Sequence, residues 1–296
     1  WYYSLIAAVA FLFFPHIQGL LSVGHNTKIR ALMCIPLMFY AFLQFTEKRN
    51  ILSFLFMTLM LSLQFRTKHY QIIFYTLLLL LAYGIYMVVV WVRHKNIKTI
   101  AVSVTMFIAS AGLAVLMSAL PLFVAQDYTP HSTRGGKAIT LSEDSSTAGS
   151  KGVSFDYATQ WSYSFREYLA TIIPGAMGHT SAFVYEGDTY PSLRGRQLPT
   201  YWGDLGSTQS SEYFGIIIVV LAVTGMWIYR KNGTVIVLSA LLAFSFLLSL
   251  GKHFPPLYKL LFYHLPYFSK FRVPMMILTL MHILLVLLAV FGLRGI

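Results

Sequence analysis

Long apolar runs alternate with short polar turns along most of the chain. The runs are 15 to 23 residues long, and about 20 residues of α-helix cross a hydrocarbon core about 30 Å thick. The pattern therefore predicts an all-α protein, a polytopic helical transmembrane bundle. The predicted apolar segments are residues 2–23, 31–45, 51–65, 70–92, 99–120, 213–229, 234–250 and 274–293.

The segments 31–45 and 51–65 are short for a full crossing, at 15 residues each. Each could cross with flanking side chains reaching the interface or with local thinning of the membrane. A helical hairpin that enters and returns would preserve the sidedness of everything downstream. The sequence leaves open whether these two segments cross fully.

One long polar stretch, residues 121–212, interrupts the apolar pattern. It holds nine of the ten acidic residues of the chain, so a reaction that needs a carboxylate must draw mainly on this stretch. The predicted organisation is transmembrane helices over 1–120, a large loop or subdomain over 121–212, and transmembrane helices over 213–296 with an outer loop at 251–272.

The sidedness follows from the connections between the segments. Basic residues divide equally between the two sets of short connections, so their count decides nothing. The turns at 46–50, 93–98 and 230–233 are short and basic, as cytoplasmic turns are, and long loops cross membranes largely regardless of charge. We therefore expect residues 121–212 to be extracytoplasmic in a protein integral to the bacterial inner membrane.

Composition changes this picture little. Only 11% of the residues are charged, against roughly 25% in soluble domains. The net charge of +12 fits basic loops beside membrane helices better than nucleic-acid binding.

Cys34 is the only cysteine, which rules out an intrachain disulfide. No histidine and carboxylate pair has metal-ligand spacing on one helix. The sequence predicts no metal site and assigns no cofactor.

Polar side chains inside the apolar runs, at His16, Gln18, Gln44 and Gln64, favour interhelical hydrogen bonds over ligand binding.

Several cations fall on the predicted outer side, against the usual charge bias. Such cations suit a phosphate or pyrophosphate at the membrane surface. The alternative, that they pair with the carboxylates of the long loop, is equally open. The candidate residues for anion binding are His25, Lys28, Arg30, Arg66, Lys68, His69 and Arg272.

Aromatic residues flank single carboxylates within the long loop. Asp156 precedes Trp161, and Asp204 follows Tyr201 and Trp202. Rings that stack on sugar faces beside a carboxylate suit sugar recognition, so these residues are candidates for substrate binding. Composition alone favours an aromatic belt at the membrane interface. Residues 165–173 have the spacing of a short amphipathic helix, ended by Pro174.

Short sequence motifs spread along the chain resemble the YfhO family of bacterial membrane proteins. Together they are specific, although each is weak alone. The motifs are Gly24-His-Asn-Thr-Lys28, the Arg66-x-x-His69-x-Gln71 region, Ser132-Thr-Arg-Gly-Gly136, Asp156-Tyr-Ala-Thr-Gln-Trp-Ser162, Leu198-Pro-Thr-Tyr-Trp-Gly-Asp204 and Lys270-Phe-Arg-x-Pro274.

The resemblance implies a glycosyltransferase of the GT-C type. Such enzymes transfer sugars from polyprenyl-phosphate donors on the outer side of the cytoplasmic membrane, here to a cell-envelope glycan or lipid-linked polymer. Their catalytic acid usually lies in the first outer loop. The chain resembles an internal fragment that begins two or more helices later, so the catalytic residue is unknown and no residue inherits that role.

A non-catalytic protein is the alternative. A flippase-like transporter or a scaffold for lipid-linked glycans would use the same cations and aromatic residues. The partners expected in either case are membrane lipid, a polyprenyl-phosphate-linked sugar and an envelope glycan.

Overall fold

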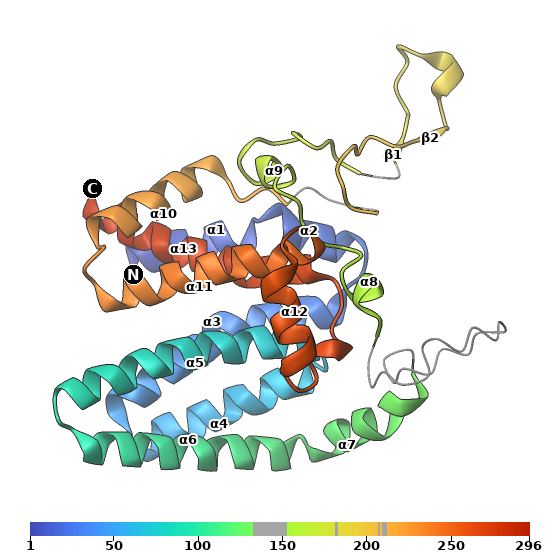
Figure 1. The fold of residues 1–296 in the computed structure, drawn as a ribbon. Helices are drawn as coiled ribbons and strands as arrows, with labels where there is room; N and C mark the ends of the chain where they lie inside the picture. The colour runs from blue at the N-terminus through green and yellow to red at the C-terminus, as the bar shows by residue number, and fades with distance from the viewer. Residues whose placement is uncertain (133–152, 181–182, 207, 209–211) are drawn as a thin grey trace.

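Helices make up almost all of the regular structure (Figure 1). The computed structural model of the chain describes residues 1–132, 153–180, 183–206, 208 and 212–296. The elements of these residues, with 3-10 helices labelled η, are α1 (Tyr2–Leu12), α2 (Pro15–Ser22), α3 (Asn26–Lys48), α4 (Ile51–Arg66), α5 (Tyr70–Arg93), α6 (Ile97–Met117), α7 (Ala119–Tyr128), η1 (Thr129–His131), α8 (Phe155–Ala158), α9 (Tyr168–Ile172), β1 (Phe183–Val184), η4 (Pro191–Leu193), β2 (Gln197–Leu198), α10 (Ile216–Ile228), α11 (Gly233–Ser249), η5 (Gly251–His253), α12 (Pro255–His264), η6 (Phe268–Lys270), η7 (Pro274–Ile277) and α13 (Leu278–Gly295).

Four segments of the described chain are long and apolar enough to cross a membrane. They are α3, α5, α6 and the stretch Pro274–Gly295 that contains α13. The bent pair of α1 and α2 makes a fifth if it is taken as one broken span. These helices confirm the predicted all-α class and are consistent with a membrane protein.

The predicted segment 2–23 is broken because of Pro15. Proline disfavours a helical conformation in the residue before it, and Phe14 is extended, with φ −59° and ψ 133°. The helix therefore stops after Leu12 and restarts at Pro15, with a bend of 45°.

Helix lengths differ from the lengths of the apolar runs. The run 31–45 lies within α3, which has 23 residues because the polar residues on both sides continue the helix. The run 51–65 matches α4, which at 16 residues belongs with the shorter apolar helices α10 and α11. Helical structure also passes residue 120, since α7 extends to Tyr128. In the loop, the expected helix over 165–173 is reduced to α9.

Asparagine begins the helix after each short basic turn. The side-chain oxygen of Asn50 accepts a hydrogen bond from the Ser53 amide at 2.9 Å. Asn96 and Asn232 accept from backbone amides three residues later, at 3.2 Å in both cases. These caps satisfy amide groups that the first turn of a helix leaves unpaired.

The long helices run side by side, so the molecule has two ends (Figure 1). The turns that carry the Asn caps lie at one end, called here the turn end. The described parts of residues 129–215 lie at the opposite end, together with α12, and we call this the loop end. This placement agrees with the prediction that successive connections between the apolar segments lie alternately at opposite ends of the helices.

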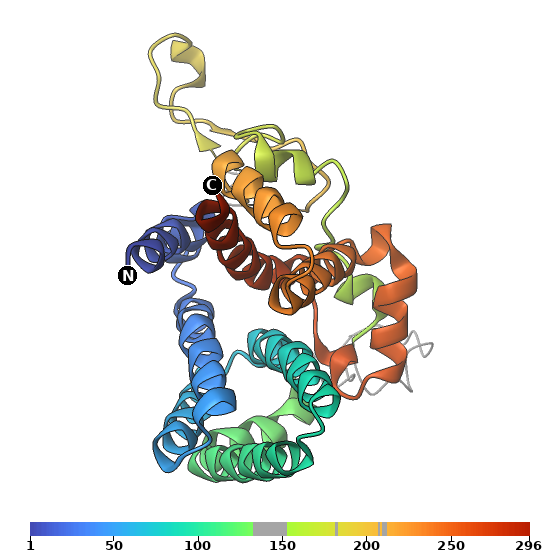
Figure 2. The same ribbon diagram turned by 90° about the vertical axis from the view of Figure 1, so that its left-hand side faces the viewer.

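The helices form two groups when they are viewed nearly end-on (Figure 2). In one group α4 packs against α3 and α6, and in the other α13 packs against α10, α11 and α1. Helix α5 joins the groups, because it contacts α3 and α6 on one side and α11 on the other. The buried apolar core is continuous through both groups.

Candidate functional site: cations and a buried His–Glu–His cluster at the loop end

Three of the predicted anion-binding residues come together at the loop end. Lys28 lies half-buried in the first turn of α3, and Arg272 is exposed just before η7. The charges of Lys28 and Arg272 interact, although the residues are far apart in sequence. Burial and the neighbouring charge of Lys28 lower the pKa of His25, which favours its neutral form at pH 7. We call Lys28 and Arg272, together with the neutral His25 beside Lys28, the cation cluster.

The long loop reaches the cation cluster through α8. The Arg272 guanidinium donates a hydrogen bond to the Tyr157 hydroxyl and lies 5.6 Å from the centre of that ring. The amide of Val273 donates to the carbonyl of Ala158 at 3.0 Å. The segment from 154 to 161 is thereby fixed against the chain that carries Arg272.

No carboxylate of the described chain forms an ion pair with the cation cluster. The ion pairs among the described residues are His16–Glu212 and the exposed pair Arg194–Asp188. Glu212, a carboxylate of the long loop, nevertheless interacts with Lys28 through its charge. Pairing of the cations with loop carboxylates therefore stays an open prediction beside the binding of an external anion.

The other predicted cations share the loop end without joining the cluster. Arg30, Arg66 and Lys68 are exposed and form no ion pair with a described residue. His69 begins α5, and its Nδ1 accepts a hydrogen bond from the Ile72 amide at 3.4 Å. This bond gives His69 a capping role in the helix.

Tyr201, one of the predicted sugar-binding aromatics, bonds to a buried carboxylate outside the predicted set, Glu167. Only 2% of Glu167 is exposed. Its Oε1 accepts hydrogen bonds from the Tyr201 hydroxyl and, at 2.8 Å, from the Asp204 amide. Burial and the bond to Glu167 raise the pKa of Tyr201. Tyr201 therefore helps to hold this part of the loop together.

The remaining predicted sugar-binding residues differ in exposure. Trp202 is 60% exposed, and its indole N–H donates to the Ala176 carbonyl at 3.2 Å. The side chains of Asp204 and Asp156 are exposed. Trp161 is half-buried and packs against the apolar core. The structure does not bring the two aromatic motifs into one described pocket.

A buried ionisable cluster lies beside the cations and joins three distant segments. His16 of α2 lies with its Nδ1 2.7 Å from Oε1 of Glu212, at the end of the long loop. The ring of His282, on α13, stacks on His16 with 5.2 Å between ring centres. Glu212 and His282 are 7% and 1% exposed. We call these residues the His–Glu–His cluster.

Several polar atoms of the His–Glu–His cluster are buried without a hydrogen-bond partner among the described residues. They are His16 Nε2, Glu212 Oε2 and both ring nitrogens of His282. Burial opposes ionisation of Glu212, but His16, with His282 and Lys28, holds its pKa below the ordinary value. The Glu212 carboxylate is thus charged near neutral pH, and it also interacts with Lys28 of the cation cluster.

Sequence reasoning recognised only part of this cluster. His16 was expected to bond between helices, and its actual partner is a loop carboxylate. His282 was missed, although an ionisable residue inside an apolar run is itself a signal of a special environment. Gln64 behaves as expected, since its amide donates to the Ala31 carbonyl and to Thr76 Oγ1, on two other helices.

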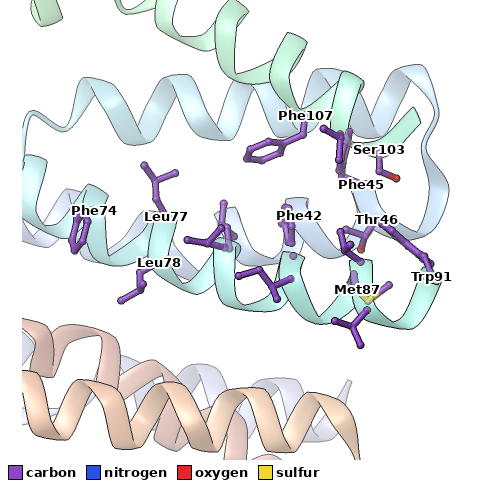
Figure 3. Close-up of a pocket in the computed structure, with 17 residues that line it drawn as sticks. Phe42, Phe45, Thr46, Phe74, Leu77, Leu78, Met87, Trp91, Ser103 and Phe107 are labelled. Carbon is purple, nitrogen blue, oxygen red and sulfur yellow. The ribbon is translucent and has the colours of Figure 1, made fainter. Parts of the chain in front are cut away.

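An apolar groove of about 640 Å³ lies between α3, α5 and α6 (Figure 3). It extends along α5 from Phe74, near the loop end, to Trp91, near the turn end. Phe74 also packs on Phe271 with 5.4 Å between ring centres, directly before Arg272. The groove therefore begins close to the cation cluster.

No group of three or more potential metal ligands among the described residues is arranged to hold a metal ion. The motif residues 133–136 lie outside the described residues. No protein-family model, no curated protein and no solved structure matches the chain.

Proposed function

We propose that this protein binds a membrane lipid that carries a phosphate or pyrophosphate, with the anionic group on the cation cluster. The supporting observation is that the charges of Lys28 and Arg272 interact, with His25 beside Lys28, while neither cation forms an ion pair with a carboxylate of the described chain and Glu212 acts on Lys28 only through its charge. Like charges held together are unfavourable, and a bound anion would remove this cost.

The apolar groove supports a lipid ligand over a soluble one. Its lining consists mainly of Phe, Leu, Val and Met side chains of membrane-spanning helices. The contact between Phe74 and Phe271 places the loop end of the groove beside Arg272. A lipid could place its headgroup on the cations and its chain along α5.

The function we propose in full is that of a membrane glycosyltransferase similar to the YfhO family and the GT-C type. The donor would be a polyprenyl-phosphate-linked sugar and the acceptor an envelope glycan or lipid-linked polymer, on the extracytoplasmic side of the inner membrane. The cations would stabilise the negative charge that develops on the phosphate leaving group. The proposal assigns binding roles only and names no catalytic residue.

The binding step can be tested with the full-length protein in nanodiscs. We expect Lys28→Gln and Arg272→Gln each to weaken binding of a polyprenyl phosphate at least about tenfold, because a charge-assisted hydrogen bond contributes about 1.5–3 kcal/mol. Native mass spectrometry would measure the bound fraction. Lys98→Gln, at the turn end, is the matched control and should bind as the wild type does.

Transfer of a radiolabelled sugar from a polyprenyl-phosphate donor separates the enzyme from a transporter or scaffold. An enzyme transfers the label to envelope acceptors, and both variants reduce transfer. Binding without transfer would favour the scaffold or transporter. Unchanged binding in both variants would refute the phosphate site.

A further inference from the structure

Helix α12 lies across the direction of the spanning helices. Figure 1 shows it running across the direction of α5, α11 and α13, at the loop end. Figure 2, which views the long helices nearly end-on, shows α12 at the edge of the molecule, outside their outline. In a membrane crossed by those helices, α12 would lie parallel to the surface, and no described spanning helix would separate it from the lipid beneath.

One face of α12 is fixed to the protein. Tyr258 and Phe262, one turn apart, are buried. Tyr258 packs on Phe268 and Phe262 on Phe155, with 5.4 and 5.6 Å between ring centres. These contacts hold α12 against η6 and the segment of α8, so its other face is presented outward in a defined orientation.

The outward face combines apolar and aromatic side chains. Leu260 and Tyr263 of α12 are 57% and 65% exposed, and Tyr267, three residues after the helix, is 72% exposed. The ring of Tyr263 also stacks on Phe155 with 6.4 Å between ring centres. A tyrosine at a membrane surface places its ring among acyl chains and its hydroxyl among headgroups. Exposed groups of this kind are costly in water and favourable in the interfacial layer.

The charged residues of α12 and of the segments directly before and after it are all basic, whereas α8, which packs on α12 through Phe155, carries Asp156. Lys252, Lys259 and Lys270 lie on or beside the helix, and the sequence contains no acidic residue after Glu212. Lys259 Nζ lies 5.4 Å from the ring centre of Phe155, at the junction with α8. Anionic lipids attract lysines near a membrane surface, so the charges complement an anionic headgroup layer.

We infer that α12 is an interfacial helix that docks on the bilayer surface, with its outward face among acyl chains and its lysines on anionic phospholipid headgroups. A short helix with an apolar face flanked by lysines has the composition of helices that lie in the interface. The inference depends on the spanning helices but not on the proposed lipid-phosphate site or on sugar transfer.

The depth of α12 can be measured with a fluorescent label at a single cysteine. Leu260→Cys, in a Cys34→Ser background, would carry an environment-sensitive fluorophore in proteoliposomes. We expect quenching by nitroxides on the headgroup or the upper acyl chain, and little by iodide in the buffer. Ser192→Cys, exposed on the loop within η4, is the matched control and should be quenched by iodide only.

Quenching of the Leu260→Cys label by iodide alone would place α12 in water and overturn the inference. Protection from both quenchers would mean that another protein surface covers the face, and would overturn it equally.

The headgroup preference gives a second test. Spin-labelled phosphatidylglycerol should associate with the wild type more strongly than spin-labelled phosphatidylcholine. We expect Lys252→Gln and Lys259→Gln each to lower this preference by up to about fivefold. Arg196→Gln, an equal charge change at an exposed loop residue, should leave it unaltered. An unchanged preference for phosphatidylglycerol in both lysine variants would refute the anionic-lipid contact.

Discussion

Glu212 shows how one residue can connect the loop to the membrane helices. Its carboxylate is buried, and a buried charge is costly unless it is paired. His16 provides the pairing from a helix near the start of the chain, and His282 adds a stacked ring from α13. The stability of the loop end therefore depends on an interaction among three residues that lie far apart in sequence.

Removal of His16 should be strongly destabilising. His16→Phe keeps an aromatic ring but leaves the Glu212 carboxylate buried without its partner, and breaking a buried pair in this way typically costs about 3–5 kcal/mol. Thermal unfolding in detergent would measure the loss. The double variant His16→Phe/Glu212→Leu should recover much of the stability, and no recovery would show that His16 acts through packing alone.

The pH dependence of the stability should also reveal the contribution of the Glu212 carboxylate. Its pKa in the folded protein lies below the ordinary value of a glutamate carboxyl. The charged carboxylate therefore stabilises the fold above that ordinary value, and this stabilisation is lost as the pH falls through the lower folded pKa. Wild type and Glu212→Gln should differ by a constant amount above about pH 5.5. The difference should shrink in more acidic solution, and a constant difference down to pH 3 would contradict the assignment.

Close approach of α10 and α13 depends on two glycines. A Cβ at Gly225 would collide with the backbone of α13 at Leu288, and a Cβ at Gly292 with the backbone of α10 at Leu221. Small residues let helix backbones come close in membranes, where van der Waals packing rather than the hydrophobic effect drives association. These two positions set the distance between the helices.

Larger side chains at this crossing should separate the helices. We expect Gly225→Val and Gly292→Val to lower the free energy of unfolding by about 2 kcal/mol or more, because both backbones must move apart. Gly112→Val is the matched control on α6, where an added Cβ meets no atom within 4 Å. Equal thermal stability of all three variants would show that the crossing tolerates side chains.

Sidedness is a property of the whole chain, and the two ends of the molecule make it testable. We expect Ser192→Cys, in the Cys34→Ser background, to react with a membrane-impermeant maleimide in intact cells. Lys95→Cys, in a turn at the opposite end, should react only after permeabilisation. The reverse pattern would place the long loop in the cytoplasm and exclude a donor site on the outer side.

The helical class and the number of apolar runs were predictable because hydropathy is a local property of the chain. Helix lengths were less predictable. Four of the five residues from Asn26 to Arg30 are polar, yet they begin α3, because polar side chains at a helix end can reach water. A proline within an apolar run indicates a kink, so the sequence alone marks the position of the break at Pro15. The bend angle depends on how α2 packs against α3 and how α1 packs against α13.

The candidate site was predictable only as a set of residue types on one side of the membrane. The sequence predicted cations on one side of the helices, and in the tertiary structure the charges of Lys28 and Arg272 interact beside His25, while His69 caps α5. The pairing of His16 with Glu212 and His282 could not be read from the chain. Hydrophobic periodicity acts between neighbours in sequence, but the meeting of residues 16, 212 and 282 depends on how helices from both ends of the chain pack together.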